Sequence, residues 1–159
     1  MLALADKVIE KIDAVAGAYH RLVILAGPCQ SGKTLCLNMV HERIDAPLIN
    51  INLELSQKLM ELPRRQRAFE ASKLVGDMVT GKEDSCVLLD NIEILFHPEL
   101  ALDPLRLLQK LSRNKTIVST WNGNLDGVYL AYAEPGHPEY NRWPVSNLAI
   151  IPINLNENL

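Results

Sequence analysis

The sequence predicts an α/β fold in which one open, mostly parallel sheet of five strands lies between helices. Short, fully apolar runs, typical of strands buried on both faces, alternate with segments whose apolar residues recur at helical spacing. Parallel neighbours need such helical crossovers, which are right-handed in nearly all proteins. The alternation runs along the whole chain, so we expect residues 1–159 to form a single domain.

Each element follows from a local pattern of residues. The apolar runs expected to be strands are residues 22–26, 48–53, 86–90, 116–121 and 148–153. The expected helices are an opening amphipathic one over residues 4–19, then 33–43, 69–79 with Gly81 as its stop, and one that starts at Asp103-Pro104. Residues 123–146 are expected to be an irregular insertion or a hairpin, with a candidate strand at 128–133.

Composition and charge narrow the class of protein. Apolar residues make up 48% of the chain and charged residues 22%, as in an ordinary globular protein. No apolar run approaches the roughly 20 residues of a membrane-spanning helix, and charges interrupt the N-terminus before a signal peptide forms, so we expect a cytoplasmic protein. The three cysteines lack metal-ligand spacing and are expected to be reduced thiols.

The charge distribution does not indicate a large nucleic-acid interface. The net charge is −3, whereas a nucleic-acid-binding domain is typically basic. A basic cluster of Arg64, Arg65 and Arg67 is a candidate for a local DNA or partner contact, and a solvated helix start is the commoner explanation.

The pattern G-x-x-x-x-G-K-[ST] is met in full by residues 27–34, which we call the glycine loop. Its glycines let the backbone curl so that N–H groups and the next helix N-terminus converge on phosphate oxygens. Lys33 is expected to reach the β- and γ-phosphates, and the Thr34 hydroxyl to coordinate Mg²⁺. The residues expected to bind ATP are Gly27, Pro28, Cys29, Gln30, Ser31, Gly32, Lys33, Thr34 and Leu35.

An acidic residue at the end of a strand completes the expected metal site. Asp90 ends the run of residues 86–90 and is expected to be the second protein ligand of Mg²⁺. ATPases with an additional strand between these two motifs often carry a glutamate at the next position, where this chain has Asn91. Because an amide does not accept a proton as a carboxylate does, Glu93 or Glu54, the latter at the end of the expected second strand, is the candidate base. A solvated loop residue and a helix cap are the competing interpretations of these two glutamates.

Further polar residues are candidates for contacts with the γ-phosphate. Asn122, with Thr120, lies at the tip of the expected fourth strand and is a candidate sensor, although Asn122-Gly123 is also a typical turn dipeptide. Arg106 and Arg113 lie on or just after the fourth helix. Either arginine would stabilise the transition state in the site of a neighbouring subunit, which requires an oligomer. Pairing with acids on an exposed helix face is the alternative for both.

Several stretches outside the glycine loop resemble one protein family. They are YHRLV (19–23), NLELS (52–56), LLDNIEILF (88–96), DPLRLLQ (103–109) and AEPGHPEY (133–140). Together with the loop, they are similar to the BrxF family, the small P-loop proteins of type 3 BREX bacteriophage-defence systems. The resemblance covers about residues 8–150. It implies a bacterial cytoplasmic protein whose partners are a large P-loop ATPase, a PglZ-type protein, a DNA adenine methyltransferase and a helicase.

Residues 114–117 read N-K-T-I and lack the aspartate of a guanine-binding motif, which favours ATP over GTP.

Three functions are compatible with these residues. The first hypothesis is an AAA+-like P-loop ATPase core of the additional-strand class without a helical lid. Its hydrolysis would depend on a partner or on a nucleotide-dependent homo-oligomer. The second is a nucleotide-gated scaffold with little hydrolysis, which Asn91 favours. The third is a small P-loop kinase with the arginines of residues 64–67 as a phosphate lid.

Overall fold

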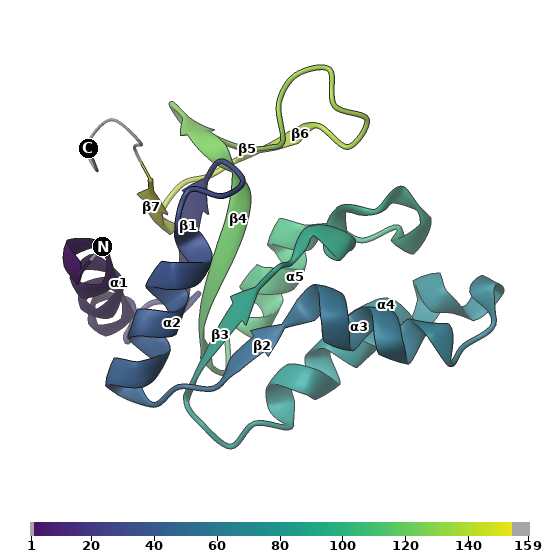
Figure 1. The fold of residues 1–159 in the computed structure, drawn as a ribbon, viewed down its shortest axis with the longest axis horizontal. Helices are drawn as coiled ribbons and strands as arrows, with labels where there is room; N and C mark the ends of the chain where they lie inside the picture. Colours follow the sequence, from purple (N-terminus) through teal and green to yellow (C-terminus); the bar gives the residue numbers. More distant parts are fainter. Residues whose placement is uncertain (1, 154–159) are drawn as a thin grey trace.

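A computed structural model describes residues 2–153 of the chain (Figure 1). The helices are α1 (Leu2–Ala14), α2 (Lys33–Ile44), α3 (Ile51–Met60), α4 (Arg64–Thr80) and α5 (Pro104–Leu111), with two short 3₁₀ helices, η1 (Glu93–Phe96) and η2 (Pro98–Leu100). The strands are β1 (Leu22–Gly27), β2 (Leu48–Asn50), β3 (Cys86–Asp90), β4 (Thr116–Asp126), β5 (Tyr129–Tyr132), β6 (Asn141–Pro144) and β7 (Ala149–Pro152). No helix within residues 2–153 combines the length and the apolar character needed to cross a membrane.

The sheet confirms the prediction of a mostly parallel α/β fold. Five strands lie in the order β2-β3-β4-β1-β7, and every neighbouring pair on this path is parallel. The carboxyl ends of β1, β3 and β4 therefore meet at one edge, which is where ligands bind in open α/β sheets.

Two apolar layers hold the helices to the sheet. On β1, Ile24 packs with α3, α4 and α5 on one face, whereas Val23 and Leu25 pack with α1 and α2 on the other. This separation follows from the alternation of side chains along a strand. Figure 1 shows the same division, with α1 and α2 on one side of the central strands and α3 to α5 on the other.

The prediction of a strand over residues 48–53 is wrong in its second half. β2 ends at Asn50, whose side-chain oxygen accepts a hydrogen bond from the Leu53 amide at 3.1 Å and caps α3. The apolar residues that follow recur at helical spacing, with Ile51, Leu55 and Leu59 buried. Glu54 consequently lies in the first turn of α3 and not at a strand end.

The opening helix is shorter than the predicted 4–19, because α1 begins at Leu2 and ends at Ala14. A turn over residues 15–20 follows, and Gly17, a weak helix former, lies within it. The helix that was expected to stop at Gly81 ends at Thr80, with Gly81 as its C-cap. Asp103 caps α5 through the Arg106 amide at 3.1 Å, as predicted.

The segment 123–146 forms an antiparallel extension of the sheet. β4 continues past the end of β1 to Asp126, pairs with β5, and β5 pairs with β6. The turn falls at Gly127 (φ 59°) and Val128, in place of the Asn122-Gly123 turn. A Cβ on Gly123 would lie 1.8 Å from the Ala131 carbonyl oxygen, so this glycine permits the close approach of β5.

Candidate functional site

The glycine loop joins β1 to α2 and curls around the Lys33 side chain. Gln30 (φ 60°) and Gly32 (φ 98°) are left-handed, a conformation that turns the backbone sharply. Lys33 is 6% exposed, and its Nζ donates hydrogen bonds to the Gly27 oxygen at 2.9 Å, the Pro28 oxygen at 2.5 Å and Ser31 Oγ at 3.3 Å. The loop thus holds a buried ammonium group at the start of a helix.

The electrostatics of Lys33 are set by burial and by its acidic neighbours. Desolvation lowers the pKa of Lys33, whereas Cys29, Glu93 and Asp90 act in the opposite direction. A cation with two carboxylates nearby, at a helix N-terminus, is suited to bind a polyanion that brings its own metal ion.

A cavity of about 430 Å³ lies between the glycine loop and the ends of β3 and β4. Its walls are Cys29, Gln30, Ser31, Gly32, Lys33, Thr34, Asp90, Asn91, Glu93, Thr120 and Asn122. Most of the residues singled out in the sequence therefore share one cavity, although they come from three separate stretches of chain.

Asp90 is fixed by hydrogen bonds at the end of β3. Its Oδ1 accepts from Thr120 Oγ1 and from the Asn91 amide, both at 2.9 Å, and the residue is 6% exposed. Among the described residues, Oδ2 has no hydrogen-bond donor, which leaves it for another ligand. Thr120 therefore positions Asp90, a role distinct from the sensor role predicted for it.

The oxygen atoms at this edge fit Mg²⁺. The Thr34 hydroxyl and the Asp90 carboxylate line the same cavity, and Mg²⁺ typically takes one or two protein oxygens and completes its shell with phosphate and water. No group of three or more His, Cys, Asp or Glu residues within residues 2–153 is arranged to hold a metal by itself. The donor set thus suits a metal that arrives with a phosphorylated ligand.

Glu93 is held between two side-chain amides. Asn52 Nδ2 donates to Oε2 at 3.0 Å, and Asn122 Nδ2 donates to Oε1 at 2.5 Å. Asn52 is itself anchored. Its side-chain Oδ1 accepts a hydrogen bond from the Ile94 main-chain amide at 2.8 Å, and its main-chain amide donates to the Asn91 carbonyl oxygen at 2.8 Å. The carboxylate is thus tied to α3, η1 and β4 at once.

Asn91 occupies a backbone position that disfavours glutamate. Its φ is 51°, in the left-handed region that asparagine tolerates better than most residues. The chain then turns into η1, which brings Glu93 to the cavity wall. The carboxylate that the position after Asp90 lacks is therefore supplied by Glu93, one short turn beyond the strand.

Other predicted site residues lie outside this cavity. Glu54 is in the first turn of α3, and the Leu35 side chain is 55% exposed on α2. Gly27 and Pro28 belong to the loop without lining the cavity, and a Cβ on Gly27 would lie 2.7 Å from Ser31 Oγ, so that side chain would have to shift to admit a larger residue.

The two candidate arginine fingers lie away from the cavity of the same chain. Arg106 is exposed on α5. Arg113 follows α5, and its guanidinium lies 4.7 Å from the ring centre of Tyr19. This pair is at the edge where β1 and β4 begin, opposite to the glycine loop.

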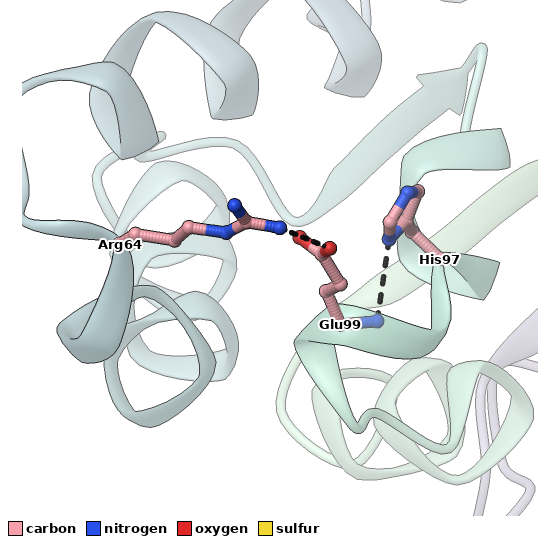
Figure 2. Close-up of polar contacts among 3 residues, drawn as sticks. All are labelled: Arg64, His97 and Glu99. Atoms are coloured by element: carbon pink, nitrogen blue, oxygen red, sulfur yellow. Dashed lines mark hydrogen bonds and ion pairs between the residues drawn. The ribbon is translucent and has the colours of Figure 1, made fainter.

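Two of the three clustered arginines have partners within the chain. Arg64 donates to Glu99 of η2 at 2.5 Å and thereby lowers the pKa of that carboxyl (Figure 2). Figure 2 also shows the Glu99 amide donating to His97 Nδ1, at 3.2 Å. Arg67 Nε donates to the Leu62 oxygen at 3.3 Å. The Arg64 pair ties α4 to η2 and the Arg67 bond ties α4 to the turn before it, and both favour structural roles over a mobile phosphate lid.

Comparisons with known proteins identify no family for this chain. No family model and no curated protein matches it. Among solved structures, PCH-2 of C. elegans is similar over 79% of this chain and 37% of that one, with 19% identity and a TM-score of 0.37.

Proposed function

We propose that the chain is an AAA+-like P-loop NTPase core that binds ATP with Mg²⁺ at the glycine loop and hydrolyses it with Glu93 as general base. One observation carries this proposal: the Glu93 carboxylate is held by Asn52 and Asn122 in a cavity whose other walls are the glycine loop and Asp90. A base needs a fixed position within reach of the reacting atoms.

The residues divide the work of phosphoryl transfer to water. Backbone N–H groups of the loop and the Lys33 ammonium bind the phosphates and oppose the charge that builds up on them. Mg²⁺, held by Thr34 and Asp90, supplies further positive charge when bound. Glu93 accepts the proton of the attacking water, while Asn122 orients both that carboxylate and the water.

A second candidate function is a nucleotide-gated scaffold. Both carboxylate oxygens of Glu93 already accept amide hydrogen bonds from Asn52 and Asn122, which compete with an attacking water for them. In this reading, ATP binding orders a surface for partners, and hydrolysis begins only when an assembly breaks one of these hydrogen bonds to Glu93.

The biological setting that we propose is BREX defence against bacteriophages, in the bacterial cytoplasm. It is supported by the similarity of residues 88–96, 103–109 and 133–140 to the BrxF family. The proposed partners are the large P-loop ATPase, the PglZ-type protein and the methyltransferase. Co-expression with these proteins, followed by affinity capture with and without ATP, should recover a complex that Lys33→Ala weakens. Capture that is absent, or that is indifferent to nucleotide and to this substitution, would refute the setting.

ATP turnover by the purified chain tests the enzymatic proposal. ATP hydrolysis should exceed GTP hydrolysis, require Mg²⁺ and be lost in Lys33→Ala. Sedimentation of the same samples reports whether ATP drives homo-oligomers. If it does, Arg106→Ala and Arg113→Ala should each lower turnover and leave ATP affinity intact. Because Arg113→Ala also removes the contact with Tyr19, its thermal stability is measured against that of the unmodified chain. Turnover that survives Lys33→Ala would reject the assignment of the site.

A further inference from the structure

A second, larger cavity adjoins the candidate site. Its volume is about 910 Å³, within the range of sites that hold drug-sized ligands. It is lined by Pro28, Cys29, Asn122, Gly123, Asn124, Tyr132, Ala133, Glu134, Pro135 and His137. Cys29 and Asn122 line both cavities, so the second one opens beside the end of the site that holds Glu93.

The outer wall of this cavity is hydrogen-bonded to the candidate sensor residue. The Ala133 amide donates to the Asn122 oxygen at 3.0 Å, and the Asn122 side chain in turn donates to Glu93. Ala133 is left-handed (φ 62°), and the turn after it is closed by the His137 amide donating to the Glu134 oxygen at 3.0 Å. A ligand that shifts this turn therefore acts on Asn122 through one hydrogen bond.

An aromatic cluster provides a second connection between the extension and the site. The Phe96 ring stacks on Tyr132 with centroids 3.5 Å apart and meets Trp121 edge-on at 4.9 Å. Phe96 ends η1, which begins with Glu93, and Trp121 directly precedes Asn122. Both catalytic candidates thus lie next to residues packed against the extension.

The chemistry of the cavity favours a cation. Glu134 is the single carboxylate among the lining residues, His137 is the single basic side chain there, and no ion pair engages Glu134 within residues 2–153. Burial raises the pKa of Tyr132 to about 12, and the negative charges of Glu139 and Glu93 add to this shift.

The shape of the lining selects among cations. The rings of Pro28, Pro135 and Tyr132 share the lining with Glu134 and offer apolar surface. An arginine side chain has an apolar stem and a planar head that pairs with a carboxylate through two hydrogen bonds, and it also stacks on rings.

We propose that this cavity binds an arginine side chain of a partner protein, with Glu134 as its counter-ion, and that its occupancy is transmitted through Asn122 to Glu93. The binding step stands independently of the function proposed above. The transmission step rests on that function, since it assigns the clamped Glu93 a part in hydrolysis.

Nuclear magnetic resonance tests both steps without ATP. The probe is N-acetyl-argininamide, titrated into the ¹⁵N-labelled chain, and the control ligand is N-acetyl-citrullinamide, which has the same shape but no charge. We expect saturable shifts of the Gly136 and Asn124 amides, with half-saturation on the order of 1 mM for a ligand of this size. The side-chain NH₂ resonances of Asn122 and Asn52 should shift together with them.

Two substitutions separate specific binding from a general charge effect. Glu134→Gln should weaken binding about tenfold, because it removes a charge-assisted pair. Asp126→Asn removes the same charge from the tip of β4, outside the lining, and should change binding by less than about twofold.

The outcomes are distinct for the two steps and for the proposed function. No saturable shift, equal binding of the citrulline analogue, or equal effects of the two substitutions would overturn the binding site. Binding that leaves the Asn122 and Asn52 side-chain resonances unmoved would overturn the transmission. A chain that binds the probe as expected but never hydrolyses ATP would contradict the enzymatic function and leave the cavity assignment standing.

Discussion

Replacing Glu93 by glutamine is the most direct test of the candidate base. The substitution keeps the size of the side chain and removes its ability to accept a proton at neutral pH. In the structure, one carboxylate oxygen accepts from Asn52 and the other from Asn122. Asn52 cannot invert its amide without cost, because its oxygen is bonded to the Ile94 amide. The introduced amide therefore keeps the bond from Asn52, and the bond to Asn122 is lost unless the Asn122 amide inverts, so one bond at most is lost.

These contacts give the expected magnitudes. Loss of one partly buried hydrogen bond costs about 1 kcal/mol, a small part of the roughly 5–15 kcal/mol that stabilises a typical domain. The variant should therefore fold. General-base catalysis contributes about 10²–10⁴ in rate, so kcat should fall by about a hundredfold or more. ATP affinity should stay within about threefold, because Lys33 and the loop are unchanged.

The assay is steady-state ATP hydrolysis, with ATP affinity measured separately by calorimetry and folding by urea titration. Glu54→Gln is the matched control, since this glutamate lies in α3 outside the cavity and should leave kcat unchanged. Turnover of Glu93→Gln within a factor of about three of the unmodified chain would refute Glu93 as the base. So would an equal loss in Glu54→Gln.

Three further substitutions test other parts of the structure. Lys33→Ala should weaken Mg·ATP binding by about tenfold to a hundredfold in calorimetry, whereas Lys58→Ala on the exposed side of α3 should not. Gly123→Ala should cost about 3 kcal/mol in urea unfolding, because its Cβ would overlap a backbone oxygen of β5, while Gly76→Ala in the open interior of α4 should stabilise by about 0.5 kcal/mol. Burial raises the pKa of Cys36 from 9.0 to about 11, so folding stability should fall as the pH rises from 9.0 through 11. That loss is on the order of 2 kcal/mol for Cys36, and Cys36→Ala should remove this part of it in unfolding curves recorded across this range, whereas Cys86, whose pKa burial also raises to about 11, keeps its own contribution.

The parallel core could be predicted because its signals are local. A buried strand such as β1 is apolar at every position, and the start of α5 is marked in the sequence by its N-cap, Asp103. The error at residues 48–53 arose because an apolar run fits a strand and a buried helix equally well. The deciding residue was Asn50, whose cap ends β2 and begins α3. A helix cap inside an apolar run is therefore the signal to seek.

The hairpin extension shows a different limit. Asn122-Gly123 and Asp126-Gly127 are both typical turn dipeptides, and the sequence alone does not rank them. The structure turns at Gly127 because β4 finds a partner in β5 only by continuing past β1. Pairing between strands decided the outcome, and it also placed Asn122 at the site as part of a strand.

Part of the candidate site could likewise be predicted from local motifs, and part of it depends on contacts between distant segments. The glycine loop and Asp90 belong to short motifs whose residues are neighbours in sequence, so the pattern is sufficient to locate them. The two hydrogen bonds that hold Glu93 come from Asn52 and Asn122, which are 41 and 29 positions away from it, and Asn52 could not be recognised without the order of the strands.

The sequence left Glu93 and Glu54 as equal candidates because both are acidic and both follow a strand in the expected fold. The early start of α3 removes that equality. It places Glu54 in the first turn of α3, outside the cavity lining, and brings Asn52, two residues earlier, to the carboxylate of Glu93. Asn91 then has its own explanation, since a left-handed residue after β3 is what directs η1 and its glutamate to the cavity.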